Sequence, residues 1–313
     1  MKTRYLLDAI ASKYRNTKIK SIPKLNMSNI LINTQSRRSN KLINHIDKVL
    51  IIACKESTQQ LQEVFIQEGF QCEVLRQENK PEFQNFSRSY LCLLNHCCAW
   101  KQAIQEDKPI IIVEADFVPV VNFSQLPLPF NPDQTDVGIS WLYTCAPQIY
   151  NISSHGYVEG FSTSAVAYIV TPQSAGYLLE LAEEIREKVG ETKYSTWDSN
   201  IDSFLRKRKL KNYLPWRNYG EHGGLPNPEH SQNNLSNPHR ADTLYGKLTF
   251  MPLYAVDQKP EKLKFLTVRL QARIKGLGRL ATGRFLRPKL IKQSKTPIKL
   301  ISFAVLRQFS LRL

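Results

Sequence analysis

Two short, continuous runs of apolar residues constrain most strongly how this sequence can fold. The first covers residues 48–54 (KVLIIAC), and the second covers residues 108–116 (KPIIIVEAD). Uninterrupted runs of β-branched residues are typical of strands that are buried on both faces, as in a parallel sheet between layers of helices. The two runs therefore indicate an α/β fold.

The segments around these runs alternate between helical and strand patterns. Helical spacing is found at 57–68 and 90–106, the latter with an apolar face that contains Leu91, Leu94, Cys98 and Ala103. Further strands are expected at 70–75, 137–142 and 165–170, and a helix opened by Pro172 is expected at 173–189. This order predicts a mostly parallel sheet flanked by helices.

Charge divides the chain into three segments. Of the 43 Lys and Arg residues, 11 lie in 1–48 against two acids (+9), and 15 lie in 259–313 against Glu261 alone (+14). The remaining 17 basic and 24 acidic residues leave 49–258 at −7. We therefore predict a basic, loosely ordered lead-in over 1–45, a catalytic-type domain over 46–257 and a basic extension over 258–313.

The basic extension has the pattern of an amphipathic helix. Apolar residues three or four apart alternate with basic ones: Leu263, Leu266, Leu270, Ile274 and Leu277 with Lys264, Arg269, Arg273 and Lys275. Basic ends of this kind can meet nucleic acid, anionic lipid or an acidic glycan. Among these we expect an anionic membrane surface to be the partner of the C-terminal segment.

The cysteine pattern and the hydropathy indicate a location. The six cysteines form no C-x-x-C pair, and neither a signal peptide nor an apolar stretch of the roughly 20 residues that a spanning helix needs is found. We therefore expect reduced thiols, a cytoplasmic protein and peripheral attachment to the inner face of a membrane.

An acid-x-acid triplet ends the second apolar run. Glu114-Ala-Asp116 lies at the C-terminal end of a buried strand, which is where open α/β sheets bind their ligands. A divalent cation (Mn²⁺ or Mg²⁺) held by such carboxylates can neutralise a departing diphosphate. We expect Asp116 to ligate the metal and Glu114 to be its partner in a nucleotide-sugar site, although such a triplet also occurs as a solvated turn.

The triplet and its surroundings resemble a motif block of family 25 glycosyltransferases, the lipooligosaccharide and collagen galactosyltransferase family. The similar residues are Asn95-His96, then Trp100, Ala103-Ile104 and the strand 109–116; residues 162–175 and 197–202 are similar to later parts of that family. The resemblance covers about 48–255. It implies a GT-A-like nucleotide-diphospho-sugar transferase fold. Asn95 stands where the family usually has Ser, and Ala115 replaces the middle acid of its Glu-Asp-Asp, which leaves the outer acids in place.

The resemblance also implies donor-site roles for His96 and Trp100. They are four residues apart on a helix and so share one face. Both are expected to line or support the donor pocket. The alternative is a packed tryptophan and a core histidine.

A third metal ligand and a general base remain to be placed. His222, in the glycine-flanked loop Tyr219-Gly-Glu-His-Gly-Gly, is the expected ligand, with His230 and His239 as competitors. Asp198 is the expected base for the acceptor hydroxyl, with Glu221 and Asp202 in reserve. Asp198 could instead only interact with the positive N-terminal end of a helix capped by Ser195 or Thr196. The basic run 206–209 with Lys211 could complement a helix dipole or contact the diphosphate.

Together these features lead to one functional hypothesis and two rivals. We expect a metal-dependent, inverting transfer of a hexose, with galactose favoured, from a UDP-sugar to a glycan or lipid-linked saccharide in envelope polysaccharide (LPS-type) synthesis. The rivals are a nucleic-acid-binding basic protein, disfavoured because no nucleic-acid motif is found, and a catalytically inactive relative acting as a scaffold.

Overall fold

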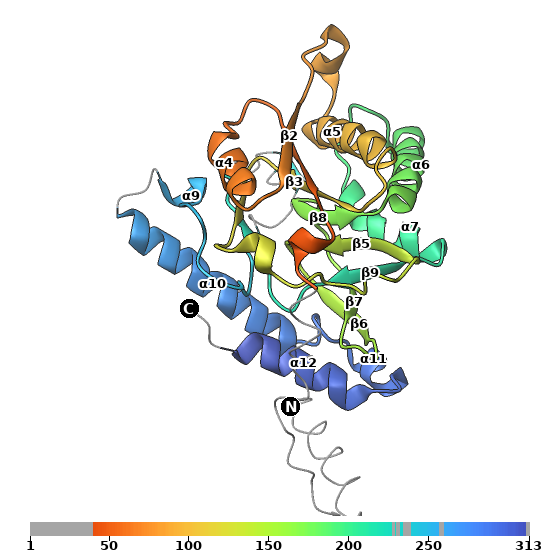
Figure 1. Ribbon diagram of the computed structural model, residues 1–313, viewed down its shortest axis with the longest axis vertical. Helices are drawn as coiled ribbons and strands as arrows, with labels where there is room; N and C mark the ends of the chain where they lie inside the picture. Colours follow the sequence, from red (N-terminus) through yellow and green to blue (C-terminus); the bar gives the residue numbers. More distant parts are fainter. Residues whose placement is uncertain (1–39, 227–228, 230–231, 234–238, 257–259, 311–313) are drawn as a thin grey trace, which may run out of the picture.

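The protein is a mixed α/β structure in which helices cover both faces of an eight-stranded sheet (Figure 1). The computed structural model describes residues 40–226, 229, 232–233, 239–256 and 260–310. Most of the predicted lead-in, residues 1–39, and His230 lie outside the described residues.

The strands of the large sheet lie in the order β2-β1-β3-β8-β5-β9-β7-β6, and β10 pairs with β4 in a separate two-stranded sheet. Their bounds are β1 Lys48–Ala53, β2 Gln71–Arg76, β3 Ile110–Glu114, β4 Phe117–Pro119, β5 Val137–Trp141, β6 Gln148–Ile152, β7 Val158–Phe161, β8 Ala167–Val170, β9 Lys211–Leu214 and β10 Gly220–His222.

The helices mostly lie on the two faces and one end of the large sheet. Their bounds are α4 Gln59–Gln67, α5 Arg88–Ala103, α6 Pro172–Val189, α7 Ile201–Lys207, α9 Leu253–Val256, α10 Glu261–Ala281, α11 Pro288–Gln293 and α12 Pro297–Phe309. Short 3-10 helices are η1 Leu42–Asn44, η2 Pro81–Asn85, η3 Phe123–Gln125 and η4 Trp197–Asn200.

The large sheet is mixed rather than mostly parallel, which refines the prediction from sequence. The pairs β1–β2, β1–β3 and β5–β9 are parallel, in agreement with the parallel part of that prediction. Strand β8 runs antiparallel between β3 and β5, and β7 and β6 also pair in antiparallel fashion. The apolar run at 165–170 correctly indicated a strand, and β8 is buried throughout, but burial does not specify the direction of a strand.

Alternate residues of the central strands point into two apolar cores. Leu50 and Ile112 lie in the core under α5 and α6, whereas Ile51 and Val113 lie in the core under α4. Helix α5 begins after Ser87, whose side chain accepts a hydrogen bond from the Tyr90 N–H. The ends of the central strands are thus held by packing on both sides of the sheet, and α5 is held by packing on one side.

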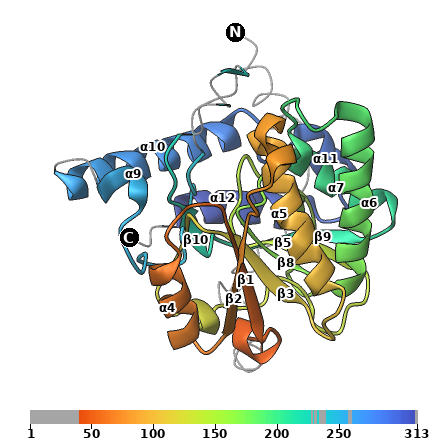
Figure 2. The same ribbon diagram turned by 90° about the horizontal axis from the view of Figure 1, so that it is seen from above.

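The C-terminal helices pack onto the domain and complete its core. Phe285, Leu300 and Phe303 join the core under α5 and α6, and α10 and α12 contact each other across one side of the molecule (Figures 1 and 2). The helix predicted over 263–277 is present within α10. Within the described residues, no helix combines the length and the apolar character needed to cross a bilayer.

Candidate functional site

The predicted acids and the predicted histidine meet at the end of β3. Glu114 is the last residue of β3, and Asp116 lies in the turn into β4. Strand β10 pairs with β4 so that His222 lies opposite Phe117. His222 Nε2 lies 3.0 Å from Asp116 Oδ2, and one ligand atom from each of Glu114, Asp116 and His222 lies within 4.8 Å of the others. The structure therefore brings His222 next to two acids that precede it in the sequence by more than 100 residues.

Asp116 and His222 stabilise each other's charge. Burial opposes ionisation of both groups, but their mutual attraction and hydrogen bond are stronger. As a result the pKa of Asp116 lies below its ordinary value and the pKa of His222 lies above it. Asp116 is consequently an anion at neutral pH, as a metal-ligating carboxylate must be.

The three side chains fit a divalent cation. Asp116 Oδ1 is buried and has no hydrogen-bond partner among the described residues, an arrangement that is costly unless a ligand completes it. Two carboxylates and a neutral imidazole supply the oxygen and nitrogen donors that Mn²⁺ accepts, and the ion would replace the proton that Asp116 favours on His222. Glu114, Asp116 and His222 could thus hold such an ion.

Two glycines after His222 permit this close approach. A Cβ at Gly224 would overlap Asp116 Oδ2, and one at Gly223 would lie 2.9 Å from the Asp116 carbonyl oxygen. The Gly223 N–H donates a 2.8 Å hydrogen bond to that same oxygen. The predicted role of the glycine-flanked loop therefore has a steric basis.

His96 and Trp100 support Glu114 from α5. Both are buried, and both contact the Tyr168 hydroxyl at 2.8 Å, His96 through Nδ1 and Trp100 through its indole N–H. His96 Nε2 lies 3.4 Å from Glu114 Oε1. A neutral His96 that accepts from Tyr168 at Nδ1 carries its proton on Nε2 and donates it to Glu114.

The sequence analysis did not identify Cys92, which also contacts Glu114. Its Sγ lies 3.8 Å from Glu114 Oε1, and Cys92, His96 and Glu114 form a second cluster of potential ligands. Burial, followed by the nearby acids, raises the pKa of Cys92 well above its ordinary value. A protonated thiol is a poor ligand, so the cluster of Glu114, Asp116 and His222 is the better cation site.

Asp198 has the electrostatics of a general base. It lies in η4 and accepts a 2.8 Å hydrogen bond from the Ser199 N–H. Desolvation, with a further contribution from the charge of Glu114, raises the pKa of Asp198 to about 7. A carboxyl group that titrates near neutrality, close enough to Glu114 to sense its charge, is suited to take a proton from a hydroxyl.

The two reserve bases are used for structural contacts instead. Glu221 is fully buried; it accepts a 2.8 Å hydrogen bond from the Ala241 N–H and pairs with Arg269 of α10. Asp202 is buried and accepts from Asn212, Tyr150 and Arg206. Both carboxylates already have their partners, so we do not propose either of them, Glu221 in particular, as the base.

Other predicted candidates also lie in local contacts. His239 is not part of the three-residue cluster, and its carbonyl oxygen accepts a hydrogen bond from the Tyr143 hydroxyl. In the basic run, Arg206 pairs with Asp202 and Arg208 pairs with Glu180. Lys211 pairs with Asp136. These contacts favour the structural alternative for the basic run.

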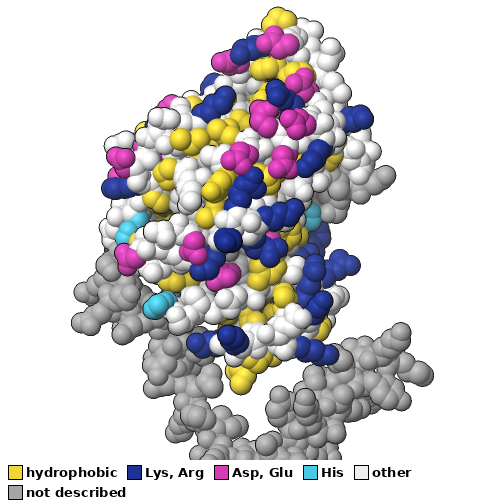
Figure 3. All heavy atoms as spheres, turned by 90° about the vertical axis from the view of Figure 1, so that its right-hand side faces the viewer, with side chains coloured by type: hydrophobic (Ala, Val, Ile, Leu, Met, Phe, Trp, Pro, Cys, Tyr) yellow, Lys and Arg dark blue, Asp and Glu magenta, His cyan; other side chains and the backbone are white. Residues whose placement is uncertain are grey.

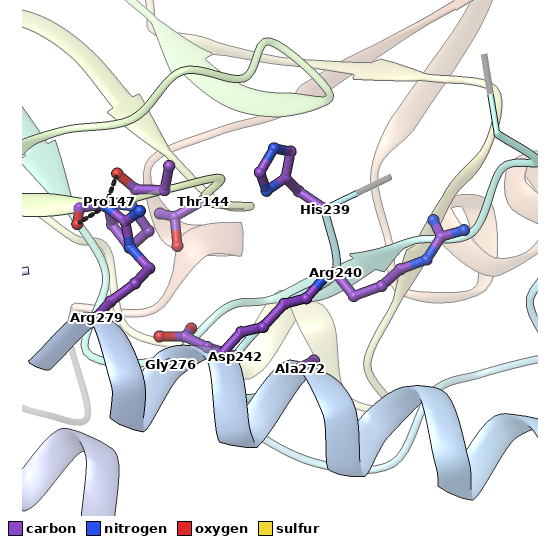
Figure 4. Close-up of a pocket in the computed structure, with 10 residues that line it drawn as sticks. Thr144, Pro147, His239, Arg240, Asp242, Ala272, Gly276 and Arg279 are labelled. Atoms are coloured by element: carbon purple, nitrogen blue, oxygen red, sulfur yellow. Dashed lines mark hydrogen bonds between the residues drawn. The ribbon is translucent and has the colours of Figure 1, made fainter. Parts of the chain in front are cut away.

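Arg240 is a site residue that the sequence did not indicate. Its guanidinium donates to the carbonyl oxygens of His222 and Gly224, the latter at 2.7 Å, and it lies over the Tyr254 ring. Its charge also helps to lower the pKa of Asp116. Arg240 and Arg279 lie at opposite ends of a small pocket between α10 and the loop that contains Pro147 (Figure 4).

A larger cavity of about 570 Å³ adjoins this pocket through Ala146 and Arg279. Its lining contains four cations, Arg279, Arg284, Arg287 and Lys289, and no acid. Thr163, which also lines it, donates a hydrogen bond to the Cys145 sulfur. The cavity would therefore attract an anionic group.

Comparison with solved structures gives distant structural similarity alone. No family model matches the chain, and no curated protein matches it in sequence. A solved structure of a glycosyltransferase involved in the glycosylation of the major capsid of PBCV-1 is similar with a TM-score of 0.37 and 7% identity, covering 53% of this chain and 80% of that one. At this distance the similarity carries no argument about function, so the site must carry it.

Proposed function

We propose that the protein is a metal-dependent glycosyltransferase with a GT-A-like site, related in its motifs to family 25. It would transfer a hexose, with galactose favoured, from a UDP-sugar to a glycan or lipid-linked saccharide with inversion of configuration. The observation that carries the proposal is the convergence of Glu114, Asp116 and His222, with one Asp116 oxygen left without a partner. Envelope polysaccharide synthesis on the cytoplasmic side of a membrane is the setting we propose.

In this account Asp116 and His222, together with Glu114, would hold the cation, which supplies positive charge for the diphosphate. Arg240 adds a fixed positive charge beside them. Asp198 takes the proton of the acceptor hydroxyl as its oxygen bonds to the anomeric carbon and the bond from that carbon to the diphosphate breaks. His96, held by Tyr168, keeps Glu114 in position.

The cationic cavity favours an acidic acceptor. Its four basic side chains suit a phosphate or carboxylate group on a saccharide. We do not propose nucleic acid as a partner, because Arg269 and Arg279 of α10 point inward, to Glu221 and to the Ala146 carbonyl oxygen. Part of the basic charge of the extension is thereby used within the fold.

Release of nucleotide from a panel of UDP-sugars tests the proposal. We expect hydrolysis that requires Mn²⁺ or Mg²⁺ and that falls about 100-fold or more in Asp116→Asn. Asp133→Asn, which changes an exposed loop acid in the same way, should retain full activity. Equal hydrolysis by native protein and Asp116→Asn would rule out the assigned site, and no hydrolysis by either would favour the inactive scaffold.

A further inference from the structure

Helix α10 presents its apolar residues to solvent. Leu263, Leu266, Leu270 and Ile274 are each between 59% and 62% exposed. Their spacing of three and four residues places them in one line along the helix. Isolated exposed leucines are common in proteins, but a continuous line of four on one helix marks an interaction surface.

The inward side of α10 is polar, and its contacts fix this orientation. Arg269 pairs with the buried Glu221, and Arg273 donates to the Asp242 carbonyl oxygen at 2.9 Å. A Cβ on Gly276 would lie 2.8 Å from Asp242 Cβ, so the helix sits very close to the domain there. Rotating α10 to bury its leucines would leave Glu221 as a buried charge without a partner, which is strongly unfavourable.

Helix α12 carries a second exposed apolar line. Ile298, Ile301, Val305 and Phe309 are exposed, and the last of these is 63% exposed. The opposite side of the helix, with Leu300, Phe303 and Ala304, is buried in the core. Helices α10 and α12 contact each other on one side of the molecule (Figures 1 and 2). Because both helices turn their other sides to the domain, the two exposed lines face away from it.

Lysines accompany the two lines, and acids do not. The exposed lysines of α10, α11 and α12 and of the turn between the last two are Lys262, Lys264, Lys275, Lys289, Lys292, Lys295 and Lys299. Glu261 is the only acid in 259–313, against 15 basic residues. In the space-filling view, Lys and Arg side chains gather in the lower half of the face, at the level of the C-terminal helices (Figure 3).

The charge selects the occupant of this surface. A second copy docked through the same face would bring the same positive charge, and residues 1–48, with 11 basic residues against two acids, would also be repelled. An anionic lipid surface instead accepts leucine and phenylalanine side chains into its outer acyl region while lysines reach the headgroups. We propose that the exposed face of α10 and α12 binds directly to membranes that contain anionic lipid.

Binding to vesicles tests this surface without reference to the donor site. The full chain is mixed with neutral phosphatidylcholine vesicles and with vesicles containing phosphatidylglycerol, and the bound fraction is measured by sedimentation at two salt concentrations. We expect binding to the anionic vesicles that weakens with salt. Leu266→Glu with Leu270→Glu should lower the partition coefficient at least about tenfold, because burial of one leucine already contributes about a factor of ten.

A matched control uses exposed apolar residues elsewhere. Ile66→Glu with Val121→Glu changes two residues that are 58% and 50% exposed outside these helices, and it should leave binding unchanged apart from the added charge. Equal loss in both variants, or equal binding of the native chain to neutral and anionic vesicles, would overturn the proposal. So would a native dimer that Leu266→Glu with Leu270→Glu converts to monomers without any binding to vesicles. Turnover of a nucleotide-sugar in free solution is a separate readout, so this surface and the proposed activity can fail independently.

Discussion

Glu114 connects the groups of the candidate site. It accepts from His96 at 3.4 Å, contacts Cys92 at 3.8 Å and contributes to the raised pKa of Asp198. Two acids close together in a partly desolvated site cannot both ionise freely, so one of them retains its proton to a higher pH. This relation between Glu114 and Asp198 makes the pH dependence of the site predictable.

The first prediction concerns Asp198. With a pKa of about 7, the carboxylate form needed by a base appears as pH rises through 7, so nucleotide-sugar transfer should rise over the same range. Asp198→Asn should remove most of the activity. A pH profile of kcat/KM that stays flat between pH 6 and 8 would contradict the assignment.

The same substitution should affect stability in the opposite direction. Because the pKa of Asp198 is higher in the folded chain than in the unfolded chain, the folded state holds its proton more tightly, and stability is lost as pH rises from about 4 to about 7. Asp198→Asn removes this cost. Its Tm at pH 8 should therefore exceed that of the native protein, whereas a Tm lower at pH 8 would indicate a structural role.

The second prediction concerns Gly224. The added methyl group of Gly224→Ala would overlap the Asp116 carboxylate, so we expect loss of cation binding and destabilisation by about 1–3 kcal/mol. Gly176→Ala is the matched control, because nothing lies within 4 Å of its Cβ in α6, and Ala is favoured over Gly in a helix by about 1 kcal/mol. Chemical denaturation and Mn²⁺ titration measure both effects. Identical behaviour of the two variants would mean that the loop is not closely packed against Asp116.

The sequence indicated the candidate ligands of this site more directly than their supports. Glu114 and Asp116 could be singled out because they end an apolar strand, and His222 because glycines surround it. The clamp from Arg240 and the partners of Glu221 depend on α10 and on the 239–242 segment, which pack there only in the tertiary structure. No local pattern marks such contacts.

At the level of elements, α12 is held to the domain by a buried charge cluster. Arg307 donates to Asp242 Oδ1 at 2.8 Å, and Gln308 and Asn218 also donate to this carboxylate. Burial alone would raise the pKa of Asp242, but Arg307 and the hydrogen bonds lower it to about 2. The cluster therefore stabilises the fold only while Asp242 is ionised.

The third prediction tests this anchor. Arg307→Ala leaves Asp242 as a buried anion without its main partner and should destabilise the protein by about 3–5 kcal/mol in urea denaturation. Lys299→Ala, at an exposed position of the same helix, should change stability by no more than about 0.5 kcal/mol. Equal effects would show that α12 is held by its apolar contacts alone.

This anchor also has a pH dependence of known sign. Because folding lowers the pKa of Asp242, the stability it contributes is present above about pH 4 and is lost as pH falls toward 2. The native chain should therefore lose stability in that window more steeply than Asp242→Asn does.

Periodicity predicted most elements, but not how they face one another. The runs at 48–54 and 108–116 contain β1 and β3, and the segment with helical spacing beyond Pro260 forms α10. A period of 3.6 shows which residues share a face of α10; it does not show that the arginine face meets the domain and the leucine face meets solvent. That choice depends on Glu221 and Asp242, which are acids distant in sequence.

At the scale of the whole molecule, the basic extension belongs to the folded body. Phe285, Leu300 and Phe303 complete the core under α5 and α6, while the outer sides of α10 and α12 remain apolar and basic. The segment that we propose to bind lipid is thus packed against the domain that carries Glu114 and Asp116. If the proposed surface and the proposed activity both hold, this packing would set the orientation of the candidate site to the membrane.

Calorimetric titration of the purified chain with Mn²⁺, with and without UDP, measures whether Glu114, Asp116 and His222 together bind a divalent cation. We expect one Mn²⁺ site that UDP tightens, that Asp116→Asn removes, and that Asp133→Asn leaves intact. Absence of Mn²⁺ binding by the folded native chain with UDP present, or binding unaffected by Asp116→Asn, would show that these three residues do not form a cation site.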